Sequence, residues 1–378
     1  MLILNKCILL PLIRGGVGVK KMIVIAVILL TEVLMISCGA AENRGVLQGR
    51  LIETYEVAGE KPFISTYADG TYYSMCTEYG ARIYSLSVSD TLGELRPVYK
   101  TESVDILNVE ANDRYATWGE LHVRGDSTDI MIYNRDDGSI KPVHSMKKLP
   151  DKEDVIMLQY PLSKLYEDSV FFVERGEDGI GTSIIQHCMT DQTEKTLYSF
   201  TEFYGYQPVL QVCGNHLASV IDADDEKVGI LLVNLLTKEQ TVVRLSDDID
   251  RVFAIDYDAA QDDLYIYYHS KKAKKEIIGV YSVGSEGLRE VYTFSNRECL
   301  ANDEIKKQGK YLIWNHYNKP KSETTELTSL YSLMVYDTEK ERLYEFENGF
   351  DYFIKDEVLY SYNFGFDRVN ELYEVRLP

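Results

Sequence analysis

The 378-residue sequence contains few prolines, tryptophans and cysteines. It has 9 prolines, 2 tryptophans and 6 cysteines, and the cysteines stand singly, without a CxxC pair or a histidine at zinc-ligand spacing. This spacing argues against a structural zinc site. A chain of this length does not need disulfide staples, so we expect free thiols, with a Cys188–Cys213 disulfide as the alternative if their strands are neighbours. Long stretches of helical periodicity are also missing.

Motifs of the common enzyme classes are absent from the chain. The sequence contains no GxSxG elbow, HExxH, Walker or GxGxxG loop and no EF-hand loop. Two tryptophans, Trp118 and Trp314, are too few for a repeated SxDxGxxW motif. We therefore predict no metal and no cofactor, although a catalytic site assembled from single residues far apart in the sequence stays open.

Positive charge is scarce as well, with 40 Lys and Arg against 60 Asp and Glu and a formal net charge of −20. Such a balance repels nucleic acid and anionic lipid headgroups. We expect no nucleic-acid partner.

The amino terminus is the one long apolar region. Residues 20–38, KKMIVIAVILLTEVLMISC, combine two lysines, an apolar run of about 16 residues and a small residue before Cys38, which is typical of an export signal. The run is short for a membrane-spanning helix, which needs about 20 residues. We interpret residues 1–37 as the signal and residues 1–18 as an upstream extension outside the translated protein, with Val19 read as the initiating methionine. An uncleaved signal anchor is the alternative.

LMISC resembles the lipobox of bacterial lipoproteins, although Met35 stands where leucine is usual. The resemblance implies that Cys38 carries a diacylglyceryl group, with acyl chains such as palmitate, and becomes the first residue after cleavage. Two or more acyl chains suffice for stable membrane anchoring. Residues 38–49 would then be the lipidated cysteine and a linker, and the protein would sit on the extracytoplasmic face of the cell membrane.

A repeat runs through the rest of the chain. One strand-like pattern recurs at intervals of 44–54 residues, and each of its last six copies is preceded by three further strand-like segments. Its aligned positions are Tyr55, Tyr99, His144, Tyr198, Val243, Tyr292 and Tyr344. Four strands at this period are typical of a β-propeller blade.

The two ends of the repeat complement each other. The last unit stops at Pro378 one strand short, whereas RLIETYEVA near Tyr55 is one strand in surplus. Pairing them closes the ring and removes an exposed edge. We predict an all-β fold: a seven-bladed propeller of four-stranded antiparallel blades over residues 50–378, with six or eight blades as alternatives. The repeat resembles the TolB-like and domain-of-unknown-function propellers of bacterial lipoproteins.

Candidate binding residues fall in loops and at strand ends. Phe203, Tyr204 and Tyr206 form an aromatic cluster in a connection between blades, where they could contact a sugar or peptide or simply fill the gap between blades. His269 and His316 occupy equivalent strand ends in adjacent units, and His122 ends a similar strand three blades away. A histidine at such a place forms part of a shared site or is only hydrogen-bonded and solvated.

The sequence therefore predicts a lipoprotein anchored to the membrane whose propeller binds a protein, peptide or glycan without catalysis. A propeller hydrolase or lyase acting on extracellular polysaccharide or peptide is the main alternative. A sensor or accessory subunit of a transporter is a third. Carboxylates or histidines from several blades that face one cavity would favour the enzyme.

Overall fold

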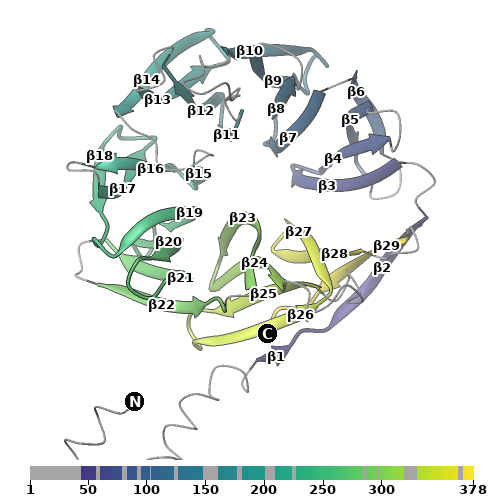
Figure 1. The fold of residues 1–378 in the computed structure, drawn as a ribbon. Coiled ribbons are helices and arrows are strands. Elements are labelled where there is room, and N and C mark those ends of the chain that lie inside the picture. The colour runs from purple at the N-terminus through teal and green to yellow at the C-terminus, as the bar shows by residue number, and fades with distance from the viewer. Residues whose placement is uncertain are drawn as a thin grey trace, which may run out of the picture.

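Seven antiparallel sheets surround a central axis in the computed structural model (Figure 1). The structure describes residues 44–56, 60–78, 83–91, 95–102, 104–122, 127–147, 161–176, 181–200, 209–223, 227–283, 287–295, 298–318, 330–364 and 369–378. Within these residues, no helix has the length and apolarity needed to cross a membrane.

Five blades are built from four consecutive strands each. From the innermost strand outward they are β3 Glu60–Ala68, β4 Thr71–Glu78, β5 Ile83–Ser89 and β6 Arg96–Glu102; β7 Val104–Ala111, β8 Tyr115–His122, β9 Ser127–Asn134 and β10 Ile140–Lys147; β11 Ser163–Tyr166, β12 Ser169–Arg175, β13 Thr182–Cys188 and β14 Thr193–Phe200; β15 Leu210–Cys213, β16 His216–Ala223, β17 Lys227–Asn234 and β18 Gln240–Arg244; β19 Ile249–Asp258, β20 Asp263–Ser270, β21 Lys275–Ser282 and β22 Leu288–Thr293.

The remaining two blades include the amino-terminal strands. They are β23 Glu298–Gln308, β24 Tyr311–Asn318, β25 Tyr331–Asp337 and β26 Arg342–Glu347, with the two-residue β1 Gly45–Val46 parallel to β26; and β27 Gly349–Lys355, β28 Val358–Phe364 and β29 Val369–Val375 with β2 Gly49–Glu56. β2 lies antiparallel to β29, with Gly49 opposite Val375 and Glu56 opposite Val369. The predicted closure of the last blade by an amino-terminal strand is confirmed, as is the count of seven blades.

The predicted repeat register is also confirmed. All seven aligned positions, from Tyr55 in β2 to Tyr344 in β26, lie on the outermost of the four strands that form the repeating blade. Inner strands are buried on both faces, as Val228–Val233 of β17 show by being buried at six consecutive positions. Neighbouring blades cover both faces of each sheet, so these strands need not alternate apolar and polar residues.

The blades pack through large side chains. Trp118 of β8 lies with Tyr73 and Leu86 of the preceding blade in one apolar cluster, and Trp314 of β24 lies with Tyr265 and Tyr267 in another. Both tryptophans are fully buried. Cys188 and Cys213 are free thiols on different blades, so the alternative of a disulfide between them is not realised.

Gly119 marks a very close approach between two blades. A Cβ atom on this residue of β8 would lie 2.2 Å from the carbonyl oxygen of Pro161, which precedes β11. The backbone at Pro161 cannot move aside as a flexible side chain can, so position 119 requires glycine.

We predict that Gly119→Ala destabilises the protein by about 2 kcal/mol or more, because the added methyl group forces the two blades apart. Urea unfolding followed by the fluorescence of Trp118 and Trp314 measures the effect. The matched control is Gly181→Ala, since a Cβ there meets no atom within 4 Å. Equal stability of the two variants would contradict the close approach.

Candidate functional site

Two groups of sequence-predicted site residues lie outside the described part of the chain. Phe203, Tyr204 and Tyr206 fall within residues 201–208, and Cys38 falls within residues 1–43. Their roles stay predictions from the sequence.

His269 lies near the end of β20 and has a carboxylate partner within its own blade. Its Nδ1 is 2.7 Å from Oδ1 of Asp250 in β19, and both side chains are one-third exposed. A partly exposed histidine with a carboxylate partner needs no ligand to satisfy it.

His316 lies near the end of β24 in the next blade and is fully buried. Its ring stacks on Phe294 with centroids 5.5 Å apart, and its Nε2 is 3.5 Å from Oε1 of Glu298 in β23. Interaction with His316 lowers the pKa of Glu298 to about 2, against the opposing effect of burial. Each of the two predicted histidines therefore has its own carboxylate, His269 near the surface and His316 in the core.

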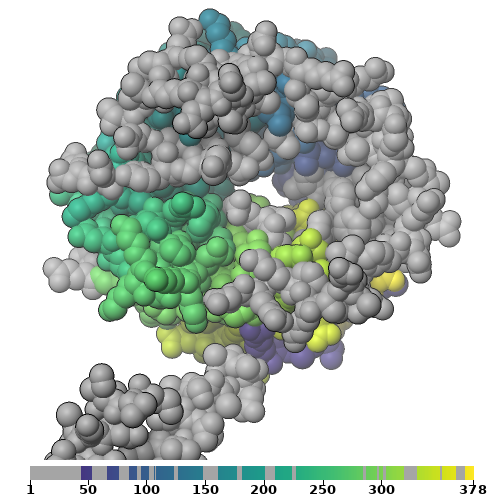
Figure 2. Space-filling view, viewed as in Figure 1, coloured from purple at the N-terminus to yellow at the C-terminus, as the bar shows by residue number. Residues whose placement is uncertain are grey.

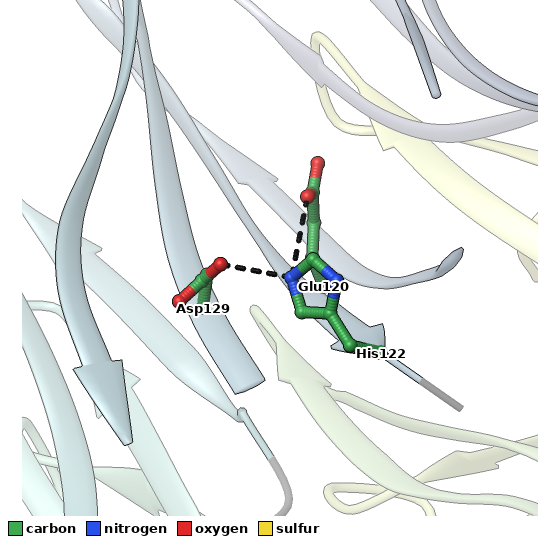
Figure 3. Close-up of side chains that lie close together, drawn as sticks. All are labelled: Glu120, His122 and Asp129. Atoms are coloured by element: carbon green, nitrogen blue, oxygen red, sulfur yellow. Dashed lines mark hydrogen bonds and ion pairs between the residues drawn. The ribbon is translucent and has the colours of Figure 1, made fainter. Parts of the chain in front are cut away.

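His122 belongs to the most concentrated group of metal-ligating side chains in the described residues (Figure 3). Glu120 and His122 are two residues apart on β8, so their side chains lie on the same face of the sheet. Asp129 lies directly opposite Glu120 on β9. His122 Nε2 is 2.8 Å from Asp129 Oδ2 and 4.0 Å from Glu120 Oε2. Donor atoms of all three residues lie within 4.8 Å of one another.

Trp118 of the same strand and Tyr99 of the adjacent blade lie against this group. Trp118 donates its indole N–H to Glu120 Oε1 at 3.1 Å, and the ring of Tyr99 in β6 lies 5.4 Å from the ring of Trp118. Burial and a hydrogen bond to Glu120 raise the pKa of Tyr99 to about 12. The group therefore sits between the β3–β6 and β7–β10 blades, with the Glu120 carboxylate held in place.

A fourth histidine-carboxylate group joins two neighbouring blades. His144 of β10 lies 3.2 Å from Glu174 through Nε2 and 3.0 Å from Glu194 through Nδ1, and His187 approaches the same Glu194 oxygen at 3.2 Å. Burial lowers the pKa of His144, but its hydrogen bonds to Glu174 and Glu194 and their charges outweigh burial and raise it. These contacts of His144 with Glu174 and Glu194 link the β7–β10 and β11–β14 blades.

Charged side chains also gather on the innermost strands, which surround the opening at the centre of the ring (Figure 2). Lys164 of β11 hydrogen bonds to Glu110 of β7. Burial opposes the charge on Lys164, yet Glu110 and Glu304 raise its pKa. Two side chains from the innermost strands of different blades therefore already neutralise each other.

The carboxylate of Asp256 in β19 accepts hydrogen bonds from two backbone N–H groups. It accepts the N–H of Tyr257 at 2.8 Å and the N–H of Lys307 in β23 at 2.5 Å. Burial raises its pKa. This carboxylate ties two neighbouring inner strands together.

The carboxylates of Glu304 in β23 and Asp351 in β27 have fewer hydrogen-bond partners than that of Asp256. Glu304 is exposed, and Asp351 accepts one hydrogen bond, at 2.8 Å, from the backbone N–H of Tyr352. Burial, with a contribution from the charge of Glu304, raises the pKa of Asp351 to about 7. Burial and the charges of Glu304, Asp351 and Asp256 also raise the pKa of Tyr352. Carboxylates from three successive blades thus share one electrostatic environment.

These channel residues were not predicted from the sequence. A signal was present, because Asp256 and Asp351 stand inside the least regular strand segments, VFAIDYDA and FDYFIK. An acidic residue inside an inner strand has to face either a neighbouring blade or the channel. Glu120 and Asp129 were missed for a related reason, since only the register between two strands brings them to His122.

The fold defines the chain as a seven-bladed β-propeller, and comparisons with solved structures agree. It matches the propeller domain of the trilobed protease from Pyrococcus furiosus, which has an open velcro topology, at 9% identity and a TM-score of 0.57, over 83% of this chain and 94% of that one. A prolyl endopeptidase matches at 10% identity and 0.55, over 87% and 50%. TolB from Acinetobacter baumannii matches at 12% identity and 0.48, over 81% and 65%.

The matches to the trilobed protease domain and the prolyl endopeptidase show a shared fold and nothing further. The chain spans half the length of the prolyl endopeptidase and just under two-thirds of TolB. No protein-family model matches the chain, and no curated protein matches it.

We predict that the stabilisation contributed by His144 depends on pH. A raised folded-state pKa means that the folded protein binds the proton more tightly, so the contribution is complete below the unfolded value of about 6.5 and is lost as pH rises through the folded pKa. His144→Gln should cost on the order of 1 kcal/mol at pH 6 and less at pH 9.

Urea unfolding from pH 6 to pH 9 measures this difference. The control is His216→Gln, because burial lowers the pKa of His216 and its effect should run in the opposite direction with pH. A difference between wild type and His144→Gln that does not change with pH would rule out the charged form at this interface.

Proposed function

We propose that the protein is a lipid-anchored extracytoplasmic binding protein whose propeller holds a positively charged peptide segment in its central channel. The acidic pair Glu304 and Asp351 is the observation that carries this proposal. A lysine or arginine side chain placed between these carboxylates gains two charge-assisted contacts in a partly desolvated site. It would also offset the electrostatic penalty that raises the pKa of Asp351.

The attachment point of the ring supports a tethered arrangement. Arg44, the first described residue, hydrogen bonds to Tyr292 at 2.9 Å and pairs with Glu345 at 3.3 Å, and Gly45 lies beside Tyr344 on the outer strand β26. The amino-terminal segment therefore meets the ring at its outer edge, away from the channel (Figure 1). A lipid on Cys38, close to Arg44 in the sequence, would hold the ring by its rim and leave the channel accessible.

A hydrolase or lyase acting on extracellular polysaccharide or peptide is the second candidate. The pKa of about 7 for Asp351 favours it, because a general acid works best with a pKa near the working pH. Glu304 would then serve as the partner carboxylate.

We predict that the purified protein binds pentalysine and that Asp351→Asn and Glu304→Gln each weaken binding about tenfold, which is about 1.4 kcal/mol. Affinity should increase as pH rises through about 7, because Asp351 then carries its charge without having to lose a proton on binding. Isothermal titration calorimetry at low salt provides the measurement.

The control variant is Asp247→Asn, which removes an equal charge from a highly exposed carboxylate paired with Lys227 at 2.9 Å. Equal losses in all three variants would mean that only net charge matters and would contradict a channel site. Mass spectrometry of the recovered peptide separates the candidates, since cleavage dependent on both Asp351 and Glu304 would replace the binding function with the hydrolase.

We predict that Cys38→Ser moves the protein from the membrane fraction to the soluble fraction and abolishes incorporation of radiolabelled palmitate. The control is Cys7→Ser, which should change neither. A Cys38→Ser protein that stays membrane-bound with an uncleaved amino terminus would identify residues 20–37 as a signal anchor.

A further inference from the structure

We propose that Glu120, His122 and Asp129 form a binding site for a divalent transition-metal ion of the zinc class. Two carboxylates and one imidazole offer one donor atom each, and these atoms lie within 4.8 Å of one another. Zinc binds such nitrogen and oxygen donors at about 2.0–2.2 Å. The two carboxylate oxygens already lie 2.8 and 4.0 Å from His122 Nε2, so small side-chain rotations bring all three donors to that distance from a common centre.

Backbone pairing fixes the spacing of the three side chains. Glu120 and Asp129 occupy directly opposed positions of β8 and β9, and His122 lies two residues further along the same face of β8. Their Cβ separations are therefore set by the sheet itself and not by a flexible loop. The donors are brought together before any ion arrives, which reduces the ordering cost of binding.

Charge balance favours a dication. The Glu120 side chain is only 4% exposed and that of Asp129 is 20% exposed, while His122 is their shared ion-pair partner. A single imidazole supplies at most one positive charge beside these two carboxylates. A dication with two carboxylates and a neutral imidazole makes a group with no net charge.

Neighbouring groups already orient the donors. The Trp118 indole N–H donates a hydrogen bond to Glu120 Oε1, and Oε2 is the oxygen that faces His122. Asp129 Oδ1 is buried and has no hydrogen-bond partner within the described structure, so it has a free lone pair beside the site. Such hydrogen bonds from neighbouring residues orient metal ligands and tune the affinity.

The nitrogen donor selects the class of ion. Calcium and magnesium prefer sites made only of oxygen, whereas imidazole with carboxylates suits zinc, manganese and related ions. A ring nitrogen that binds a metal ion uses its lone pair, so Nε2 of His122 cannot donate a hydrogen bond to Asp129 while the ion is bound. The ion then replaces the 2.8 Å hydrogen bond between these residues.

This site is separate from the acidic channel. Its ligands come from the second and third strands of one blade, whereas Glu304 and Asp351 lie on the innermost strands of two other blades. Loss of metal binding and loss of pentalysine binding should therefore occur in different variants.

The test is zinc binding by the full-length protein purified in detergent, measured by titration with ZnCl₂ and by metal analysis after dialysis. We expect one zinc ion per chain at this site and at least tenfold weaker binding in His122→Gln, Glu120→Gln and Asp129→Asn. CaCl₂ and MgCl₂ should not compete. The matched control is His269→Gln, which disrupts the equivalent histidine-carboxylate pair with Asp250 and should leave zinc binding unchanged.

Two further measurements check the fold of the variant and the ligands of the bound ion. Near-ultraviolet circular dichroism in chelator should be the same for wild type and His122→Gln, since His122 is partly exposed and Gln retains a polar donor. Cobalt substituted into the site should show no thiolate charge-transfer band, which distinguishes it from zinc on a cysteine thiol such as Cys188 or Cys299. The proposal is overturned if wild type retains no zinc, if the three variants bind like wild type, or if His269→Gln loses as much.

Discussion

Pairing between β2 and β29 is the contact on which the ring depends. It joins residues 49–56 to residues 369–375, so the two ends of the chain complete one sheet. Without it, the last blade would present an open strand edge, and the blades on either side would lose a packing partner. Because every blade is stabilised by two neighbours, closure at this single seam fixes the position of all seven around the central opening.

Closure also explains how an acidic chain tolerates buried charge. Side chains that face a neighbouring blade are shielded from water, and the charged ones form pairs with nearby residues. These pairs are Lys164 with Glu110, His316 with Glu298, and His144 with Glu174 and Glu194. These pairs join different strands or blades, so they form only in the packed ring, and removing one partner would leave the other charge buried and unpaired. Histidines that look like catalytic candidates in isolation become partners of nearby carboxylates.

Two places depart from this pattern of local neutralisation, and they lie at different depths in the blades. On the innermost strands, Glu304 and Asp351 bring like charges together, and burial leaves Asp351 with a pKa of about 7. Between two blades, Glu120 and Asp129 share one imidazole, and one oxygen of Asp129 has no hydrogen-bond partner in the described residues. At both places carboxylates outnumber the cationic side chains near them, which favours cationic ligands: an extended basic side chain in the channel and a compact ion between the blades.

The sequence by itself determined the architecture, because a strand period of 44–54 residues, the surplus strand at RLIETYEVA and the missing strand at Pro378 are local patterns that need no knowledge of contacts. It also placed His122, His269 and His316 at similar strand ends. Only the tertiary structure decided what these histidines meet. The register of β8 against β9 brings Glu120 and Asp129 to His122, and the packing of adjacent blades brings the charge of Glu304 to Asp351. Periodicity carries strand order, whereas the meeting of single side chains depends on register and blade packing, which the repeat pattern does not encode.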